Sequence, residues 1–317
     1  MIQRYILQRL LLGLVSLWGL TILVFVFLRA IPGDTAVLIL GPDSAASEAD
    51  VQALREDLGL DDPLPVQYLR WVGDLLKGDF GESLFTGRSV GEEVSSRVET
   101  TLELAVLALI ISIVVGVSSG TAAAVWRGKG REQVIRSASL LGLAIPNFWL
   151  GTMVVVYFAK WFGWIPPISH TSVFSDPVTN LQQFLIPATV VGLGLAASLS
   201  RLSRSAVLEV LREDYVRTAR AKGLAARVVL LRHTLRGSLV PIISLIAIQL
   251  GAVIAGTVVI ENVFNLPGMG RLLLDSISRK DYPMVQGIIL LYGIFIVGVN
   301  IATDVAYGLI DPRIRLS

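Results

Sequence analysis

The stretch RLSRSAVLEVLREDYVRTARAKGLAARVVLLRHTLR (residues 201–236) carries nine Arg or Lys residues and three acidic ones, and long uncharged apolar segments flank it. A basic loop between two membrane spans stays on the cytoplasmic side of the membrane. This loop is too long and too regularly patterned to be a simple turn. It therefore predicts helices that a membrane protein presents to something in the cytoplasm.

The composition, 53% hydrophobic and 16% charged residues, excludes an ordinary soluble enzyme. Six stretches lack Asp, Glu, Lys and Arg, and each is about long enough to cross a hydrocarbon core as a helix. They are Leu10–Leu28, Leu104–Trp126, Ser137–Ala159, Pro177–Ser200, Gly237–Ile260 and Tyr282–Thr303. The first resembles a secretion signal because Arg4 and Arg9 precede it, but its 19 uncharged residues favour a retained helix. The sequence predicts an all-α membrane protein with six transmembrane helices.

The basic residues predict the orientation. With both termini inside, the cytoplasmic segments hold 17 Arg or Lys residues, whereas the two short outer loops hold four. This bias follows the positive-inside rule. The segment 31–101, with 14 acidic and five basic residues, then lies outside as a small helical insertion. The predicted parts are an N-terminal transmembrane helix (1–30), the insertion (31–101), a five-helix core (102–306) that contains the loop 201–236, and a cytoplasmic tail (307–317).

The insertion contains two amphipathic patterns. The first, SEADVQALREDLGL, begins at a capping residue, Ser47, and ends at Gly59. The second, PVQYLRWVGDLL, places Tyr68, Trp71 and Leu75 on one side of a helix. Such helices pack on each other or lie on the membrane surface, and packing is the preferred interpretation.

The basic loop contains two helical patterns that meet at Gly223. The first places Leu211, Tyr215, Ala219 and Lys222 on one face, and the second repeats Val228, Leu231 and Leu235 at helical spacing. Gly223 fits the left-handed residue that ends many helices. A short helix that projects in this way is suited to a groove on a partner, although the cations also suit anionic lipid head groups. The pattern alone leaves both interpretations open.

Two other segments are candidates for a translocation path. Pro146 lies inside the third predicted span and is expected to kink it, with Asn147 as a polar lining group. Ordinary helix packing is the alternative, and small residues in the fourth span suit close helix contact. These small residues are Gly192, Gly194, Ala196 and Ala197.

The segment NLPGMG (residues 265–270) follows the fifth span, and Asn265, Pro267 and Gly268 predict a tight structure there. It is either a plug that guides substrate or a plain turn. Glu261 precedes it at the end of the span, where we expect water or head groups to reach the carboxylate, as at Glu103 and Asp304.

The run DYVRTARAKG (residues 214–223), with Pro241 beyond it, resembles the cytoplasmic EAA loop of binding-protein-dependent ABC permeases. Arg217 and Thr218 replace the first two residues of the Glu-Ala-Ala motif, and Ala219 keeps the third. The form YVRTARAKG is typical of the B-type permeases of dipeptide, oligopeptide and nickel importers. Similar segments extend over nearly the whole chain: FVFLRAIPGD, LREDLGLDDPLPVQYLRW, KGDFGESL, ENVFNLPGMGRLL, RKDYPMVQG and DPRIR.

The resemblance implies the type I ABC importer permease fold and a non-catalytic subunit of a bacterial inner-membrane transporter. The implied partners are a homologous C-type permease, two ABC ATPase subunits and an extracytoplasmic solute-binding protein, besides membrane lipid and without nucleic acid. ATP and Mg²⁺ would bind to the ATPases, so no cofactor is expected on this chain. The residues implied in ATPase coupling are Asp214, Tyr215, Arg217, Thr218, Ala219, Lys222 and Gly223.

Several kinds of chemistry are missing from the sequence. No Gly-x-x-x-x-Gly-Lys-Ser/Thr motif is present, so the energy source must be another chain or an ion gradient. His170 and His233 are the only histidines and fall in predicted loops, so neither a His-based metal site nor a catalytic triad is expected. The absence of acidic residues in mid-span argues against an ion-coupled transporter. Peptides are the expected substrate class, and nickel, glutathione or other small solutes are the alternatives.

Overall fold

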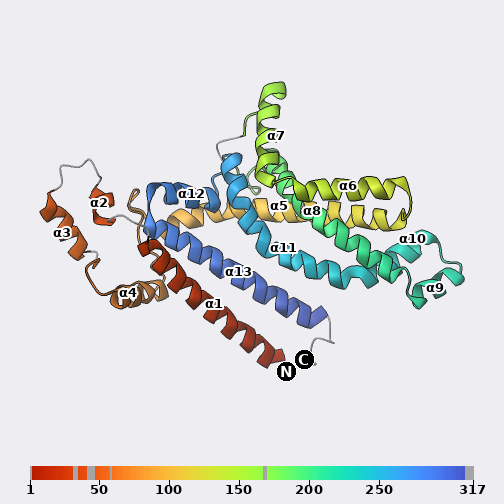
Figure 1. Cartoon of the computed structure of the whole chain (residues 1–317), viewed down its shortest axis with the longest axis horizontal. Coiled ribbons are helices and arrows are strands. Elements are labelled where there is room, and N and C mark those ends of the chain that lie inside the picture. The colour runs from red at the N-terminus through yellow and green to blue at the C-terminus, as the bar shows by residue number, and fades with distance from the viewer. Residues whose placement is uncertain (1, 31–34, 41–46, 58, 167–169, 311–317) are drawn as a thin grey trace. The chain divides into compact units, whose positions relative to one another are not determined.

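The computed structural model describes residues 2–30, 35–40, 47–57, 59–166 and 170–310. Within these residues the chain is helical, with one isolated β-bridge between Glu82 and Ser89 and no strand. The all-α prediction is therefore confirmed (Figure 1). The helices are α1 (Ile2–Ala30), α2 (Thr35–Leu40), α3 (Glu48–Asp57), α4 (Leu64–Leu76), α5 (Val90–Val125), α6 (Gly130–Ala144), α7 (Asn147–Phe162), α8 (Pro177–Val210), α9 (Asp214–Ala221), α10 (Ala226–Val228), a π-helical segment (Val229–Thr234), α11 (Leu235–Val263), α12 (Met269–Arg279) and α13 (Tyr282–Ile310).

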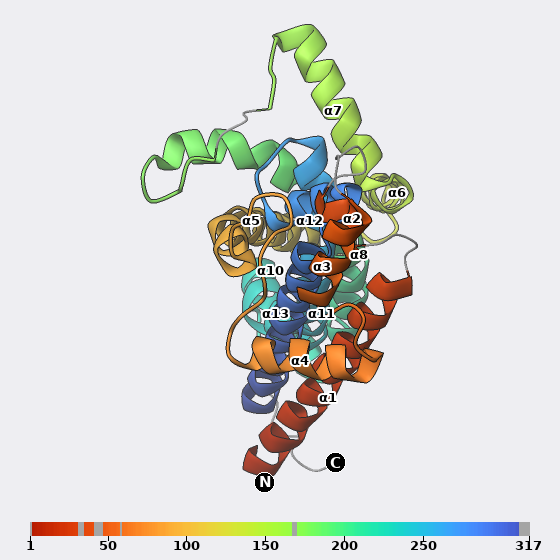
Figure 2. The same cartoon turned by 90° about the vertical axis from the view of Figure 1, so that its left-hand side faces the viewer.

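The chain divides into two compact units, and each is described by itself. The first comprises Met1–Arg97 and Leu272–Ser317, and the second comprises Val98–Arg271. In the first unit α1 and α13 lie side by side (Figures 1 and 2). Gly13 permits this contact, because a Cβ there would lie 2.9 Å from the Cγ1 atom of Val297. Small residues thus bring the two apolar helices together.

In the second unit, α5 and α8 approach each other at glycines on both helices. A Cβ at Gly120 would collide with the backbone oxygen of Ser200, and one at Gly192 would lie 2.7 Å from the backbone oxygen of Ala108. The hydroxyl groups of Ser119 and Ser200 hydrogen-bond across the same contact at 2.9 Å. The sequence-based expectation that Gly192 serves close helix packing is confirmed. Ala196 and Ala197 are also buried.

The number of apolar helices agrees with the prediction only if one broken pair counts as a single span. Five helical stretches are long and apolar enough to cross a membrane, and α6 with α7 makes a sixth if this bent pair is one span. The two helices meet at 96°. The predicted kink at Pro146 is thus a complete break, because Ile145, the residue before the proline, adopts an extended backbone.

The two amphipathic patterns of the insertion form helices α3 and α4. Ser47 caps α3 as predicted, since its hydroxyl accepts a bond from the Asp50 backbone amide at 3.3 Å. Gly59 has the positive φ, +62°, of a helix-ending glycine. The aromatic face of α4 does not pack on α3 as expected. Tyr68 and Trp71 instead contact Phe25 of α1, with ring centroids 5.3 and 5.9 Å away.

Substitution of Gly120 by alanine tests the close contact of α5 with α8. The added methyl group meets the α8 backbone, which cannot rotate away, so we expect a loss of about 1–3 kcal/mol in the free energy of unfolding. Thermal unfolding of the purified chain in detergent measures this loss. Gly256→Ala in α11 is the matched control, because nothing lies within 4 Å of its Cβ position. Equal melting temperatures for both variants would contradict the packing account.

Candidate functional site

Helix α9 is held to its own chain by a small apolar contact. Val216 and Ala219, three residues apart on one side of the helix, are buried against Val229. Val210 and Leu211, at the end of α8, pack on the same cluster.

Tyr215 also lies against α11, because a Cβ at Gly237 would collide with its hydroxyl, although the side chain is 48% exposed. The helix is therefore fixed to its neighbours by this apolar contact and by Tyr215, and its charged side is available for contact.

Gly223 ends the α9 segment as predicted. Its φ is +76°, and two backbone bonds close the turn: Gly223 N–H to Arg220 O at 2.9 Å and Leu224 N–H to Ala219 O at 3.4 Å. This pair of bonds is the Schellman motif, in which a left-handed residue satisfies the last carbonyl groups of a helix. A non-glycine residue at this φ would be strained.

The exposed part of α9 carries most of the residues implied in coupling. Asp214 and Arg217 form an ion pair at 3.2 Å, but both side chains are more than three-quarters exposed, so the pair adds little to stability. Thr218 and Lys222 are also exposed. Ala219, by contrast, belongs to the buried contact. Of the predicted face, Leu211 lies before α9, which begins at Asp214, but it packs on the same cluster as Ala219. Tyr215 and Lys222 are exposed.

The second helical pattern of the loop is helical, but it is not a regular α-helix. Val228 and Leu231, which recur at α-helical spacing, are 40% and 51% exposed, whereas Val229 and Thr234 are buried. Residues Val229–Thr234 form a π-helical segment, whose hydrogen bonds join residues five apart. The periodicity of a regular α-helix does not predict this segment.

Glu261 differs most from its sequence-based expectation. It was expected at a water-accessible span end, but its side chain is fully buried within the second unit. Its carboxylate accepts hydrogen bonds from the hydroxyl of Thr101 at 2.8 Å and from the backbone amides of Gly270 and Arg271 at 2.7 and 3.2 Å. These amides belong to the first turn of α12, where unpaired N–H groups favour an anion. The carboxylate thus joins α5, α11 and the start of α12.

The NLPGMG segment is wrapped around this carboxylate. Gly268 lies against Glu261 so closely that a Cβ would collide with the carboxylate. Asn265 adopts φ +55°, and its backbone oxygen accepts a bond from Arg271 at 3.1 Å. Within this chain the segment is a tight turn around a buried acid, with Pro267 only partly buried. The sequence signal was available: an acid at the end of an apolar helix, followed seven and nine residues later by Gly268 and Gly270.

The other predicted path residues lie elsewhere in the second unit. Pro146 precedes α7 and is exposed, and Asn147 begins that helix. The side chain of Asn147 contacts Gly194 of α8, where a Cβ would collide with it. The structure therefore brings Glu261 and Gly268 together in one place and puts Asn147 in another.

His170 takes part in a second polar cluster of the same unit. Its Nε2 lies 3.0 Å from the Glu103 carboxylate, which also accepts a bond from the Asn180 amide at 2.8 Å. Ligand atoms of Glu99, Glu103 and His170 lie within 4.8 Å of one another, a grouping that the sequence did not indicate. Since protein donors already occupy the Glu103 carboxylate, the cluster is explained as a tie between the segment before α8 and α5.

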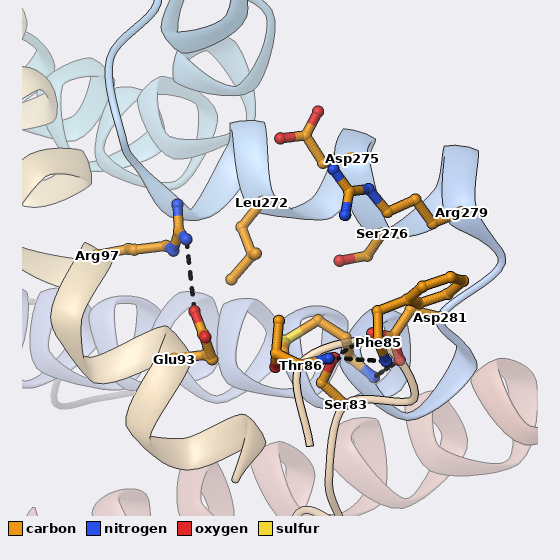
Figure 3. Close-up of a pocket in the computed structure, with 11 residues that line it drawn as sticks. Ser83, Phe85, Thr86, Glu93, Arg97, Leu272, Asp275, Ser276, Arg279 and Asp281 are labelled. Carbon is orange, nitrogen blue, oxygen red and sulfur yellow. Dashed lines mark hydrogen bonds and ion pairs between the residues drawn. The ribbon is translucent and has the colours of Figure 1, made fainter. Parts of the chain in front are cut away.

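A polar pocket of about 140 Å³ lies in the first unit (Figure 3). Its polar groups largely satisfy one another. The Ser83 hydroxyl donates to Asp281 at 2.6 Å, and Arg97 contacts Glu93 at 3.4 Å. None of the residues proposed from the sequence for coupling or translocation lines this pocket.

Replacement of Glu261 by alanine tests the buried carboxylate. The change removes the acceptor of three donors in a site closed to water, and each unsatisfied buried donor costs about 1–3 kcal/mol. We expect the free energy of unfolding to fall by at least about 3 kcal/mol, measured as a lower melting temperature in detergent. Glu209→Ala is the control, because that carboxylate is exposed. Equal stability of the two variants would refute the structural role of Glu261.

Comparison with known proteins places this arrangement in a family. Residues 112–316 match the binding-protein-dependent transport system inner membrane component, and residues 1–105 match the N-terminal part of such membrane components. The chain is 39% identical to the glutathione transport system permease protein GsiC of Salmonella paratyphi A over 98% of each chain. It is 36% identical to GsiC of Escherichia coli K12, again over 98% of each. The chain therefore belongs to the family of binding-protein-dependent transport system inner membrane components and is a permease subunit of an ABC importer.

Proposed function

We propose that this chain forms half of the translocation path of an ATP-driven importer for short peptides. The relatives named as glutathione permeases favour glutathione, an alternative cargo that is itself a tripeptide. Nickel complexes and other small solutes are the remaining alternatives. The second half of the path would come from a homologous permease, with two ATPase subunits below the membrane and a solute-binding protein outside it.

The observation that carries the proposal is the construction of α9. Val216 and Ala219 fix one side of the helix to the chain, and Tyr215 adds a contact with α11. Asp214, Arg217 and Thr218 are exposed. A short helix that is anchored on one side and charged on the other is suited to a cleft on an ATPase subunit. Arg217 and Lys222 would meet acidic groups there, and the buried side would transmit the displacement to α8 and α11.

Coupling requires that the contact between α9 and the ATPase subunit differ between the two states of the transporter. ATP binding draws the ATPase subunits together, and α9 moves with the cleft that holds it. Only a contact that differs in free energy between the inward-open and outward-open states can shift the equilibrium between them. The Gly223 turn fixes the direction of the chain after α9, so the displacement is not lost in a loose connection.

The proposed path uses the residues singled out in the second unit. The break at Pro146 and the amide of Asn147 provide polar groups between the apolar end of α6 and the apolar start of α7. We place both termini and α9 in the cytoplasm and residues 31–101 outside, because the basic residues are distributed in that way. The Glu261–Gly268 turn would then form a rigid rim at the outer side of the path.

Substitution of Gly223 by proline tests the coupling role of α9. Proline fixes φ near −65° and removes the N–H that bonds to Arg220, so the turn at φ +76° cannot form. We expect normal membrane insertion and loss of substrate-stimulated ATP hydrolysis in the reconstituted complex. Gly163→Pro is the control, since Gly163 ends α7 with a similar φ of +65°. Full ATPase stimulation in Gly223→Pro would contradict the proposal.

Purification from cells that express the whole transport operon tests the assembly, and reconstitution tests the cargo. We expect a second permease and two ATPase subunits to co-purify with this chain. Titration of the cognate binding protein with dipeptides, glutathione and a nickel chelate then identifies the substrate class. Transport by this chain alone, without ATP, would show instead that it is a self-sufficient channel.

A further inference from the structure

We propose that α4 is an interfacial helix, which lies in the membrane surface at the C-terminal end of α1 and places Leu69 and Leu76 among lipid chains. Sequence periodicity left packing and membrane contact as alternatives for this segment. The structure shows that α4 packs on α1, and the position of that contact along α1 makes membrane contact necessary as well. The proposal concerns the first unit only and does not depend on the transported solute.

The position of α4 along the apolar span of α1 supports this placement. The hydroxyl of Tyr68 lies 2.8 Å from the hydroxyl of Thr21, and Thr21 lies within the apolar span Ile6–Phe27. Thr21 precedes the end of that span by six residues, or about 9 Å along a helix axis. The threonine side chain, the 2.8 Å hydrogen bond and the tyrosine side chain together are only slightly longer than this, so the α4 backbone lies close to the apolar boundary. The polar head-group layer on each side is only about 5–8 Å thick.

The side chains of α4 fall on three different sides of the helix. Tyr68 and Trp71 contact α1, whereas Leu69 and Leu76, two turns apart on the next side of the helix, are 68% and 85% exposed. The contact with α1 thus covers only part of the apolar surface. The charged side chains lie on the remaining side: Arg70, Asp74 and Lys77. A helix with one apolar side and one charged side is suited to the plane of a membrane surface, with the apolar side toward the lipid chains.

The orientation of α4 relative to α1 and its polar contacts also fit a position at the membrane surface. Figure 2 shows α4 lying across α1 rather than alongside it, as an in-plane helix would lie against a spanning one. Tyr and Trp concentrate at membrane–water boundaries, and both are present at the contact. Arg29, just beyond the apolar span, bonds to the Gln67 side chain at 2.7 Å, which adds a polar anchor at head-group level.

Single cysteines test this placement directly, because the chain contains no native cysteine. Cysteine is introduced at Leu69, Arg70, Leu76 or Lys77, and a nitroxide spin label is attached to each. The full chain, with the subunits that assemble with it, is reconstituted in vesicles of phosphatidylethanolamine and phosphatidylglycerol. Collision of each label with oxygen, which concentrates in lipid, is compared with collision with a water-soluble nickel chelate.

We expect the ratio of oxygen to nickel-chelate collisions to be several-fold higher at positions 69 and 76 than at positions 70 and 77. Arg70 and Lys77 are matched neighbours, and their exposed ion pairs with Asp62 and Asp74 contribute little to folding. Equal, water-like ratios at all four positions would overturn the proposal. Shielding of positions 69 and 76 from both reagents would also overturn it, because a protein partner would then cover this face.

Discussion

The close approach of helix backbones is the constraint on which the second unit depends. Lipid chains are as apolar as leucine, so helices in a membrane gain little from burying leucine against leucine. Contact must instead come from shape and from hydrogen bonds. Gly120 and Gly192 let the backbones of α5 and α8 approach each other, and the Ser119–Ser200 bond fixes their register. The Gln249 side chain adds a bond to the Leu195 backbone oxygen at 2.9 Å and brings α11 into the same contact.

The elements predicted correctly from the sequence are those that depend on residues close together in the chain. Long apolar runs become helices because lipid leaves the backbone no other partner, and Gly223 ends its helix because only glycine tolerates that φ. The family was likewise predicted from short runs such as YVRTARAKG. A tight structure at NLPGMG was also predicted, as either a plug or a turn, although its cause was not. In each case the signal and the structure it produces lie within a few residues of each other.

The elements that the sequence did not predict depend on contacts between distant residues. Glu261 is buried because Thr101, 160 positions earlier, and the amides of α12 surround its carboxylate. The face of α4 is set by Phe25 of α1, which no pattern within the insertion reveals. The π-helical segment Val229–Thr234 is likewise not indicated by the α-helical spacing of Val228 and Leu231. Hydrophobic periodicity predicts the buried side of a helix only if the helix is a regular α-helix and its packing partner is known. Neither condition holds for these segments.

The right-angled corner between α6 and α7 has a consequence for its surroundings. A helix that stops leaves its last carbonyl groups without partners, and the next helix begins with unpaired amides. Hydrocarbon cannot solvate either set, and a broken helix is tolerated at membrane depth only against protein or beside water. If the pair spans the bilayer, the Ile145–Pro146 corner must therefore border a hydrated cavity or another polypeptide. The break dictates which side of this unit is turned away from the fatty acyl chains.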